Sequence, residues 1–129
     1  EVQRVEGRAA IPEGAAEVVA RLISDGVELP GAIGTFCGSI APFGGDSSYV
    51  SPALSGDPVG GGPISITERL PYFKGADASD PLVLPANSPD MLKQFPPTLL
   101  ITGSRDFAMS SVLQSQRLLT KAGVEADLH

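Results

Sequence analysis

The 129-residue sequence predicts an α/β fold with a mostly parallel sheet, flanking helices and a long irregular excursion. Short apolar segments bounded by glycine or proline lie at 31–38 and 98–102, a pattern typical of buried strands. Segments with helical periodicity come before the first strand and after the second. The order helix, strand, excursion, strand, helix, strand favours parallel pairing with right-handed crossovers.

The first helix is predicted at 13–25. Its apolar side chains recur at helical spacing and form one face: Ala15, Val18, Val19, Leu22 and Ile23. We expect Glu17 and Arg21 to pair on the opposite side, since they lie four residues apart. Gly26 is expected to end this helix.

Residues 39–97 change the character of the chain, because they hold most of its 12 prolines and a glycine-rich cluster at 60–63. Only a short helix near 66–73 and a helical turn near 89–93 are predicted here. We expect Ser47, Ser48 and Ser51 to lie in turns. Long excursions of this kind are typical of pocket walls and lids, or of linkers.

A second strand is predicted at 98–102, and a helix follows it. Small side chains suited to packing on a sheet share one face of that helix: Ala108, Val112, Ser115, Leu119 and Ala122. Ser111 and Gln114 have the spacing of a capping box, and Gly123 suits a helix end. Residues 125–129 then predict a third strand, with Glu125 and Asp127 on its exposed face.

The composition excludes several classes of function. A net charge of −6 argues against nucleic acid or an anionic membrane surface as a partner. No segment is long and apolar enough to span a membrane, no signal peptide is recognisable, and we expect a cytoplasmic protein. The single cysteine, Cys37, is expected to be a small buried hydrophobe, and we predict neither a metal site nor a cofactor.

Asp106 is the candidate functional residue, because ligands bind beyond the carboxyl ends of the strands in an open parallel sheet. A dinucleotide-binding turn would need three glycines, and residues 102–108 supply only Gly103. Two interpretations of Asp106 remain open. It accepts a hydrogen bond from a catalytic histidine, or it caps the turn that follows.

Residues 72–129 resemble the C-terminal part of an α/β hydrolase of the hormone-sensitive-lipase-like esterase family. The features that carry the resemblance are Asp80-Pro81-Leu82, the segment FPPTLL at 95–100, the segment TGSRD at 102–106 and the segment LTKAG at 119–123. The resemblance implies that Asp106 is the acid of a Ser-Asp-His triad. It also implies that 1–129 is a partial hydrolase domain with a nucleophile-side helix and strand (13–38), an excursion (39–97) and an acid-bearing unit (98–129).

The other members of such a triad are missing. Neither G-x-S-x-G nor an HGGG-type oxyanion motif occurs in the sequence, so we expect a fragment, with these motifs upstream of residue 1. Aligning the family's nucleophile turn with 7–12 puts Ala9 at the nucleophile position. His129 is expected to be a strand residue, with the family's catalytic histidine in a later loop.

The resemblance implies a carboxylic-ester hydrolase acting on small acyl esters without a cofactor. The chain alone is expected to be inactive or nearly so. Possible pocket-lining side chains are the aromatic ones near the site or on the excursion: Phe43, Tyr49, Tyr72, Phe73 and Phe107. The alternative is a non-catalytic, degenerate or truncated relative that binds a hydrophobic small molecule or a partner chain. We also expect a homodimer through the C-terminal strand, because an unpaired strand edge pairs readily.

Overall fold

The computed structural model describes residues 14–56, 61–69 and 71–129. Its three strands, β1 (Ile33–Phe36), β2 (Thr98–Ile101) and β3 (Ala126–Leu128), form a parallel sheet with β2 in the centre. All three carboxyl ends therefore lie along one edge of the sheet. The predicted α/β class and the three predicted strands are confirmed.

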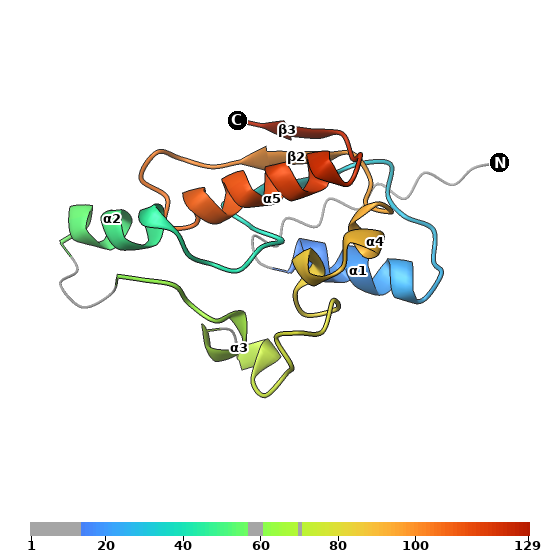
Figure 1. Cartoon of the computed structure of the whole chain (residues 1–129), viewed down its shortest axis with the longest axis horizontal. Helices are drawn as coiled ribbons and strands as arrows, with labels where there is room; N and C mark the ends of the chain where they lie inside the picture. Colours follow the sequence, from blue (N-terminus) through green and yellow to red (C-terminus); the bar gives the residue numbers. More distant parts are fainter. Residues whose placement is uncertain (1–13, 57–60, 70) are drawn as a thin grey trace.

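Helix α5 (Met109–Lys121) packs on one face of the sheet (Figure 1). Its buried face carries Val112, Ser115 and Leu119, as the sequence predicts. Val112 and Leu119 of this face belong to the core cluster, to which other helices and β2 also contribute. Its members are Ala16, Val19, Ile40, Leu92, Phe95, Leu100, Ala108, Val112, Leu119 and Val124. Phe36 and Leu99 on the strands remain exposed, since burial alternates along β1 and β2.

Helix α1 (Ala15–Ser24) ends as predicted but presents a different face to the core. Gly26 adopts φ +65°, and Val27 N donates to Leu22 O at 2.9 Å, which closes the helix end. Val18 on the predicted apolar face is 54% exposed, whereas Glu17 is only 8% exposed. The predicted Glu17–Arg21 pair is therefore wrong. Arg21 Nε instead pairs with Asp25 Oδ2 at 2.9 Å.

Burial of Glu17 has a consequence for stability. Desolvation raises the pKa of Glu17 from 4.5 to about 6. Between those two values the folded chain holds a proton that the unfolded chain releases. The contribution of the protonated Glu17 carboxyl to the free energy of unfolding is therefore fully present below about pH 4.5 and is lost as the pH rises through about 6.

We expect Glu17→Gln to raise the free energy of unfolding by about 2 kcal/mol at pH 7 and by much less at pH 4. Urea denaturation at the two pH values measures the difference, and Glu125→Gln on the exposed end of the chain is the matched control. An equal gain at both pH values would contradict a role for the Glu17 charge.

The excursion contains more helix than predicted. The structure has α3 (Ile66–Arg69) with the 3-10 turn η1 (Pro71–Phe73), and α4 (Pro89–Leu92) preceded by the 3-10 turn η2 (Pro85–Asn87), where short helical segments are expected. The sequence does not predict helix α2 (Asp46–Leu54). Ser47, Ser48 and Ser51 are therefore helical, and their assignment to turns is wrong.

Tertiary hydrogen bonds explain why α2 forms from a sequence of weak helix formers. Ser47 and Ser110 exchange hydrogen bonds, since each Oγ accepts from the other residue's backbone N, at 2.9 and 3.1 Å. Pro52 inside α2 lacks the N–H that would bond Ser48 O, and Gly62 N donates to this carbonyl instead at 3.0 Å. The first pair of bonds fastens α2 to α5, and the bond of Gly62 fastens the following part of the excursion to α2.

Ser111 also serves the docking. Its Oγ accepts a hydrogen bond from Gly44 N at 3.0 Å, and Ser111 is the third residue of α5 rather than a cap. The predicted capping box with Gln114 is therefore wrong. The other end of α5 is as predicted, with Gly123 at φ +86° and Val124 N bonded to Leu119 O.

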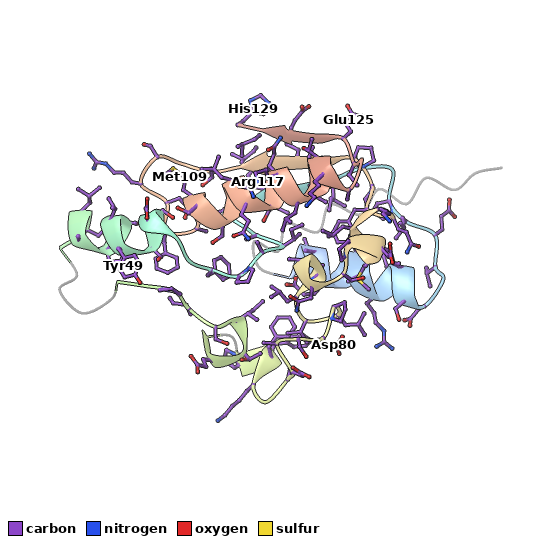
Figure 2. The ribbon with its side chains drawn as sticks, in the orientation of Figure 1. Tyr49, Asp80, Met109, Arg117, Glu125 and His129 are labelled. Atoms are coloured by element: carbon purple, nitrogen blue, oxygen red, sulfur yellow. The ribbon has the colours of Figure 1, made fainter. Side chains whose placement is uncertain are left out.

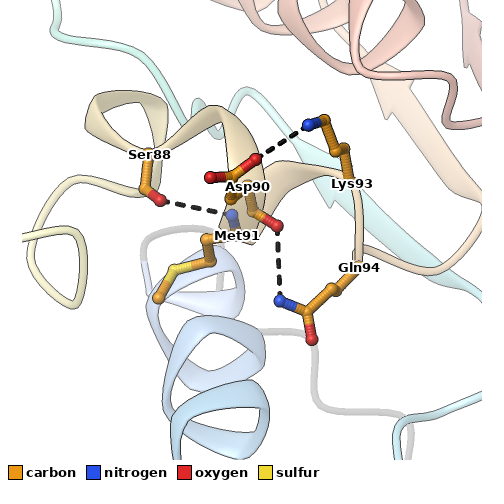
Figure 3. Close-up of polar contacts among 5 residues, drawn as sticks. All are labelled: Ser88, Asp90, Met91, Lys93 and Gln94. Atoms are coloured by element: carbon orange, nitrogen blue, oxygen red, sulfur yellow. Dashed lines mark hydrogen bonds and ion pairs between the residues drawn. The ribbon is translucent and has the colours of Figure 1, made fainter.

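Helix α4 leads the chain from the excursion into the central strand (Figure 3). Ser88 Oγ caps it by accepting from Met91 N at 3.2 Å. Lys93 Nζ lies 2.7 Å from Asp90 Oδ1 and lowers the pKa of that carboxyl. The short helix thereby turns Leu92 into the core just before β2 begins.

Candidate active site

Asp106 lies beyond the carboxyl end of the central strand. Residues from both neighbouring strands reach the same edge, Cys37 just after β1 and His129 just after β3. Backbone bonds hold these strand ends together. Cys37 N donates to Ile101 O at 2.8 Å, and Thr102 N donates to His129 O at 2.9 Å. This is the edge at which an open parallel sheet binds ligands.

The carboxylate of Asp106 is held through both of its oxygens. Thr102 Oγ1 donates to Oδ2 at 2.7 Å, and Ala108 N donates to Oδ1 at 3.0 Å. The second bond closes an Asx turn, so Asp106 does cap the turn that follows it. Each carboxylate oxygen accepts more than one hydrogen bond, and Asp106 is only half-buried. The same side chain therefore keeps acceptor sites for a further N–H donor, and the two interpretations of Asp106 are compatible.

Cys37 stands beside Asp106, which the sequence did not indicate. It is exposed rather than buried, and it adopts φ +57°, so its assignment as a small buried hydrophobe is wrong. Desolvation raises the pKa of its thiol, and the hydrogen bond to Asp106 and that carboxylate's charge add to the effect. Because the thiolate is the nucleophilic form, this environment disfavours Cys37 as a nucleophile.

His129 continues β3 by backbone pairing, since His129 N donates to Leu100 O at 2.9 Å. Glu125, Asp127 and His129 are exposed and alternate with half-buried residues, as predicted for this strand. Figure 2 shows the His129 and Glu125 side chains on the outer side of β3. The expectation that His129 is a strand residue agrees with this pairing.

The aromatic residues proposed as pocket lining take up different environments. Phe73 is buried and meets Tyr72 edge-on, with ring centroids 4.9 Å apart, while Tyr72 itself is 89% exposed. Tyr49 on α2 is exposed (Figure 2). Its ring lies against Gly61 and Gly62. Phe43 packs against the core cluster.

Phe107 is the one aromatic of this set next to Asp106 in the chain, and its carbonyl accepts from Ser47 Oγ at 2.8 Å. Two further residues that the sequence did not single out contact Asp106 or its loop. Thr102 binds its carboxylate, and Ser51 Oγ donates to Arg105 O at 2.6 Å. A threonine four residues before an aspartate at a strand end was the available local signal for Thr102. No local signal exists for Ser51, because 54 residues separate it from Arg105.

The remaining expectations concern Ala9, metal binding and membrane spans. Ala9, proposed at the degenerate nucleophile position, lies outside the described residues. Within 14–56, 61–69 and 71–129, no group of three or more histidine, cysteine or acidic side chains could hold a metal ion. Across those same ranges, no helix combines the length and apolarity needed to cross a bilayer.

Comparisons with known proteins show the family to which the chain belongs. A family model described as the alpha/beta hydrolase fold matches residues 44–129, which include Asp106. No curated protein matches the chain. Among solved structures, esterase E25 is 36% identical, with a TM-score of 0.67 over 88% of this chain and 35% of its own.

Two further structures share the fold. An esterase from the bacterial hormone-sensitive lipase family is 22% identical, with a TM-score of 0.65 over 88% of this chain and 37% of its own. Carboxyl esterase 2 from the mycorrhizal fungus Tuber melanosporum is 20% identical, with a TM-score of 0.66 over 88% of this chain and 38% of its own. The chain thus spans little more than a third of the length of these proteins. It belongs to the α/β-hydrolase fold family, and its solved neighbours include hormone-sensitive-lipase-family esterases, as its motifs predict.

Proposed function

We propose that this chain carries the acid-bearing part of a carboxylic-ester hydrolase and that Asp106 is the acid of its Ser-Asp-His triad. The observation that carries the proposal is the position of Asp106 at the ligand-binding edge of the sheet, held by Thr102 and Ala108 with acceptor sites to spare. The match to esterase E25, at 36% identity, supports the choice of an ester as substrate.

In this mechanism Asp106 accepts a hydrogen bond from the ring N–H of a histidine. That bond fixes the imidazole tautomer and stabilises the imidazolium formed when the ring takes the proton of the serine nucleophile. We assign the serine to a longer chain, since the motif that marks the nucleophile is missing here. We assign the histidine to it as well, because His129 continues β3 by backbone pairing. The substrate is a small acyl ester, with Phe43, Tyr49, Tyr72, Phe73 and Phe107 as proposed lining residues of its pockets.

The test compares the chain with a chimera. We expect the purified 129-residue chain to hydrolyse p-nitrophenyl butyrate no faster than a protein-free blank, because triad members act as a unit. In the chimera, residues 14–129 replace the matching part of esterase E25, which then supplies the remaining triad members. We expect this chimera to hydrolyse the ester with saturation kinetics. A chimera that unfolds cooperatively on heating but stays at the blank rate would contradict the proposal.

The alternative is a non-catalytic relative that binds a hydrophobic small molecule or a partner chain. Ala9 at the aligned nucleophile position favours it, since alanine has no hydroxyl to attack a carbonyl. A second chimera that keeps residues 1–13 separates the two functions. Inactivity that Ala9→Ser repairs would support the alternative, whereas activity with Ala9 in place would exclude Ala9 from the nucleophile position.

We also propose that the protein pairs with a second copy of itself through residues 125–129. Within the described residues, β3 has a strand neighbour on one side only, and such an edge is a template for pairing. A monomeric chimera in sedimentation velocity would count against this pairing.

A further inference from the structure

Two serines of α2 contact the loop that carries Asp106, one on each side of the acid. Ser51 Oγ donates to the carbonyl of Arg105 at 2.6 Å, and Ser47 Oγ donates to the carbonyl of Phe107 at 2.8 Å. Ser47 and Ser51 are four residues apart and therefore lie on the same face of α2. We name these two contacts the α2 bracket.

Each contact of the α2 bracket fixes a peptide unit that is also bound at its other end. The peptide that contributes Phe107 O contributes Ala108 N, which donates to Asp106 Oδ1 at 3.0 Å. The peptide that contributes Arg105 O contributes Asp106 N, which donates to Gly103 O at 2.9 Å. Because a peptide unit is planar, fixing its carbonyl also fixes the direction of its N–H.

Together, the two contacts determine where the carboxylate of Asp106 lies. One peptide precedes the Cα of Asp106, so its orientation sets the backbone from which the side chain leaves. The other holds Oδ1 directly, which leaves Oδ2 on Thr102. We propose that Ser47 and Ser51 are positioning residues for the acid, acting through the Arg105–Asp106 and Phe107–Ala108 peptides. The catalytic part of this inference rests on the proposed function of Asp106.

The inference gives the excursion a role beyond a pocket wall. Helix α2 also docks on α5 through the bond of Ser47 N to Ser110 Oγ, and the segment just before α2 docks through that of Gly44 N to Ser111 Oγ. Neither of these bonds involves the loop that carries Asp106. The chain therefore offers matched controls. Ser111→Ala removes a docking bond, and Ser55→Ala removes a bond within the C-terminal end of α2, from Ser55 Oγ to Ser51 O at 2.9 Å. Neither change removes a contact of the α2 bracket, because both leave the hydroxyls of Ser47 and Ser51 and their two acceptor carbonyls in place.

The first measurement uses the 129-residue chain and amide hydrogen exchange by NMR. We expect Ser51→Ala to lower the protection of the Asp106 amide about tenfold, and Ser47→Ala to do the same for the Ala108 amide. The His129 amide, which bonds Leu100 O in the sheet, is the internal reference and should not change. Ser55→Ala and Ser111→Ala should leave both loop amides within about twofold of wild type.

Ser47 is buried, so Ser47→Ala can disturb folding, and the half-buried Ser51 keeps the test decisive. Unchanged protection of the Asp106 amide in Ser51→Ala would overturn the inference. An equal loss in Ser111→Ala would do so as well, because it would assign the effect to docking alone.

The second measurement uses the esterase E25 chimera and separates kcat from KM. We expect Ser51→Ala to lower kcat about tenfold with KM changed less than about twofold, because a displaced acid affects the transition state rather than substrate binding. Ser51→Thr keeps the hydroxyl and should restore kcat. If Asp106→Asn leaves kcat unchanged, the proposed function fails. If Asp106→Asn lowers kcat and Ser51→Ala does not, the positioning role alone fails.

Discussion

Asp106→Asn is expected to lower kcat of the esterase E25 chimera by about 10⁴-fold while leaving its fold intact. Asparagine keeps one side-chain oxygen, which can still accept the hydrogen bond of Ala108 N or of Thr102 Oγ1. Its amide group, however, is a donor where the histidine needs an acceptor. The imidazole then adopts the wrong tautomer and its cationic form loses the neighbouring negative charge. Steady-state kinetics on p-nitrophenyl butyrate measure the loss.

The matched control for this substitution is Asp127→Asn. Asp127 is exposed on β3, so the same change of charge there should leave kcat within about twofold of the parent chimera. Thermal unfolding of both variants checks that the loss is chemical. A rate for Asp106→Asn close to that of Asp127→Asn would remove Asp106 from the triad and leave it the cap of an Asx turn.

Gly45→Ala is expected to lower the free energy of unfolding by about 3 kcal/mol, the largest stability change predicted for this chain. Gly45 precedes α2 with φ +82° and ψ −176°, a backbone region that is essentially restricted to glycine and costs an alanine about 1–3 kcal/mol. A Cβ at this position would also lie 2.6 Å from Ser110 Cβ at the start of α5. The new methyl group would push α2 away from α5 and break the reciprocal bonds of Ser47 and Ser110.

Gly75→Ala separates the two causes. Gly75 has the same φ of +82°, but a methyl group there would meet open space, with nothing beyond its chain neighbours within 4 Å, so only the backbone cost applies. We expect its free energy of unfolding, from urea denaturation, to fall by about 1 kcal/mol. Equal losses for the two variants would show that the clash of the new methyl group with Ser110 contributes nothing to the destabilisation of Gly45→Ala.

The elements that the sequence predicts well are those with a strong local pattern. The helix at 109–121 carries small and apolar residues on one face, and that face is the one the structure buries. Gly26 and Gly123 end their helices because both sites need a positive φ. Asp106 could be named as a candidate because parallel strands bring their carboxyl ends, and the residues after them, to one edge.

Prediction is weaker where burial depends on what surrounds an element. The periodicity of α1 predicts an apolar face that includes Val18, yet the helix turns Glu17 inward, since only the neighbouring elements decide which side is covered. Cys37 follows an apolar run, but the left-handed turn after β1 directs it to the surface beside Asp106. The local sequence pattern would be the same if Glu17 were exposed and Cys37 buried, so neither position could be predicted from it.

The sequence by itself determined the parallel sheet, the C-terminal ends of α1 and α5 and the place of Asp106 at the edge of the sheet, because hydrophobic periodicity and glycine conformation are local properties. Only the tertiary structure decided that residues 46–54 form a helix and that Ser47 and Ser51 meet the loop of Asp106. The two bonds to that loop join residues 54 and 60 positions apart. Polar contacts over such separations depend on how α2, α5 and the central strand pack together, and no spacing within a short segment encodes them.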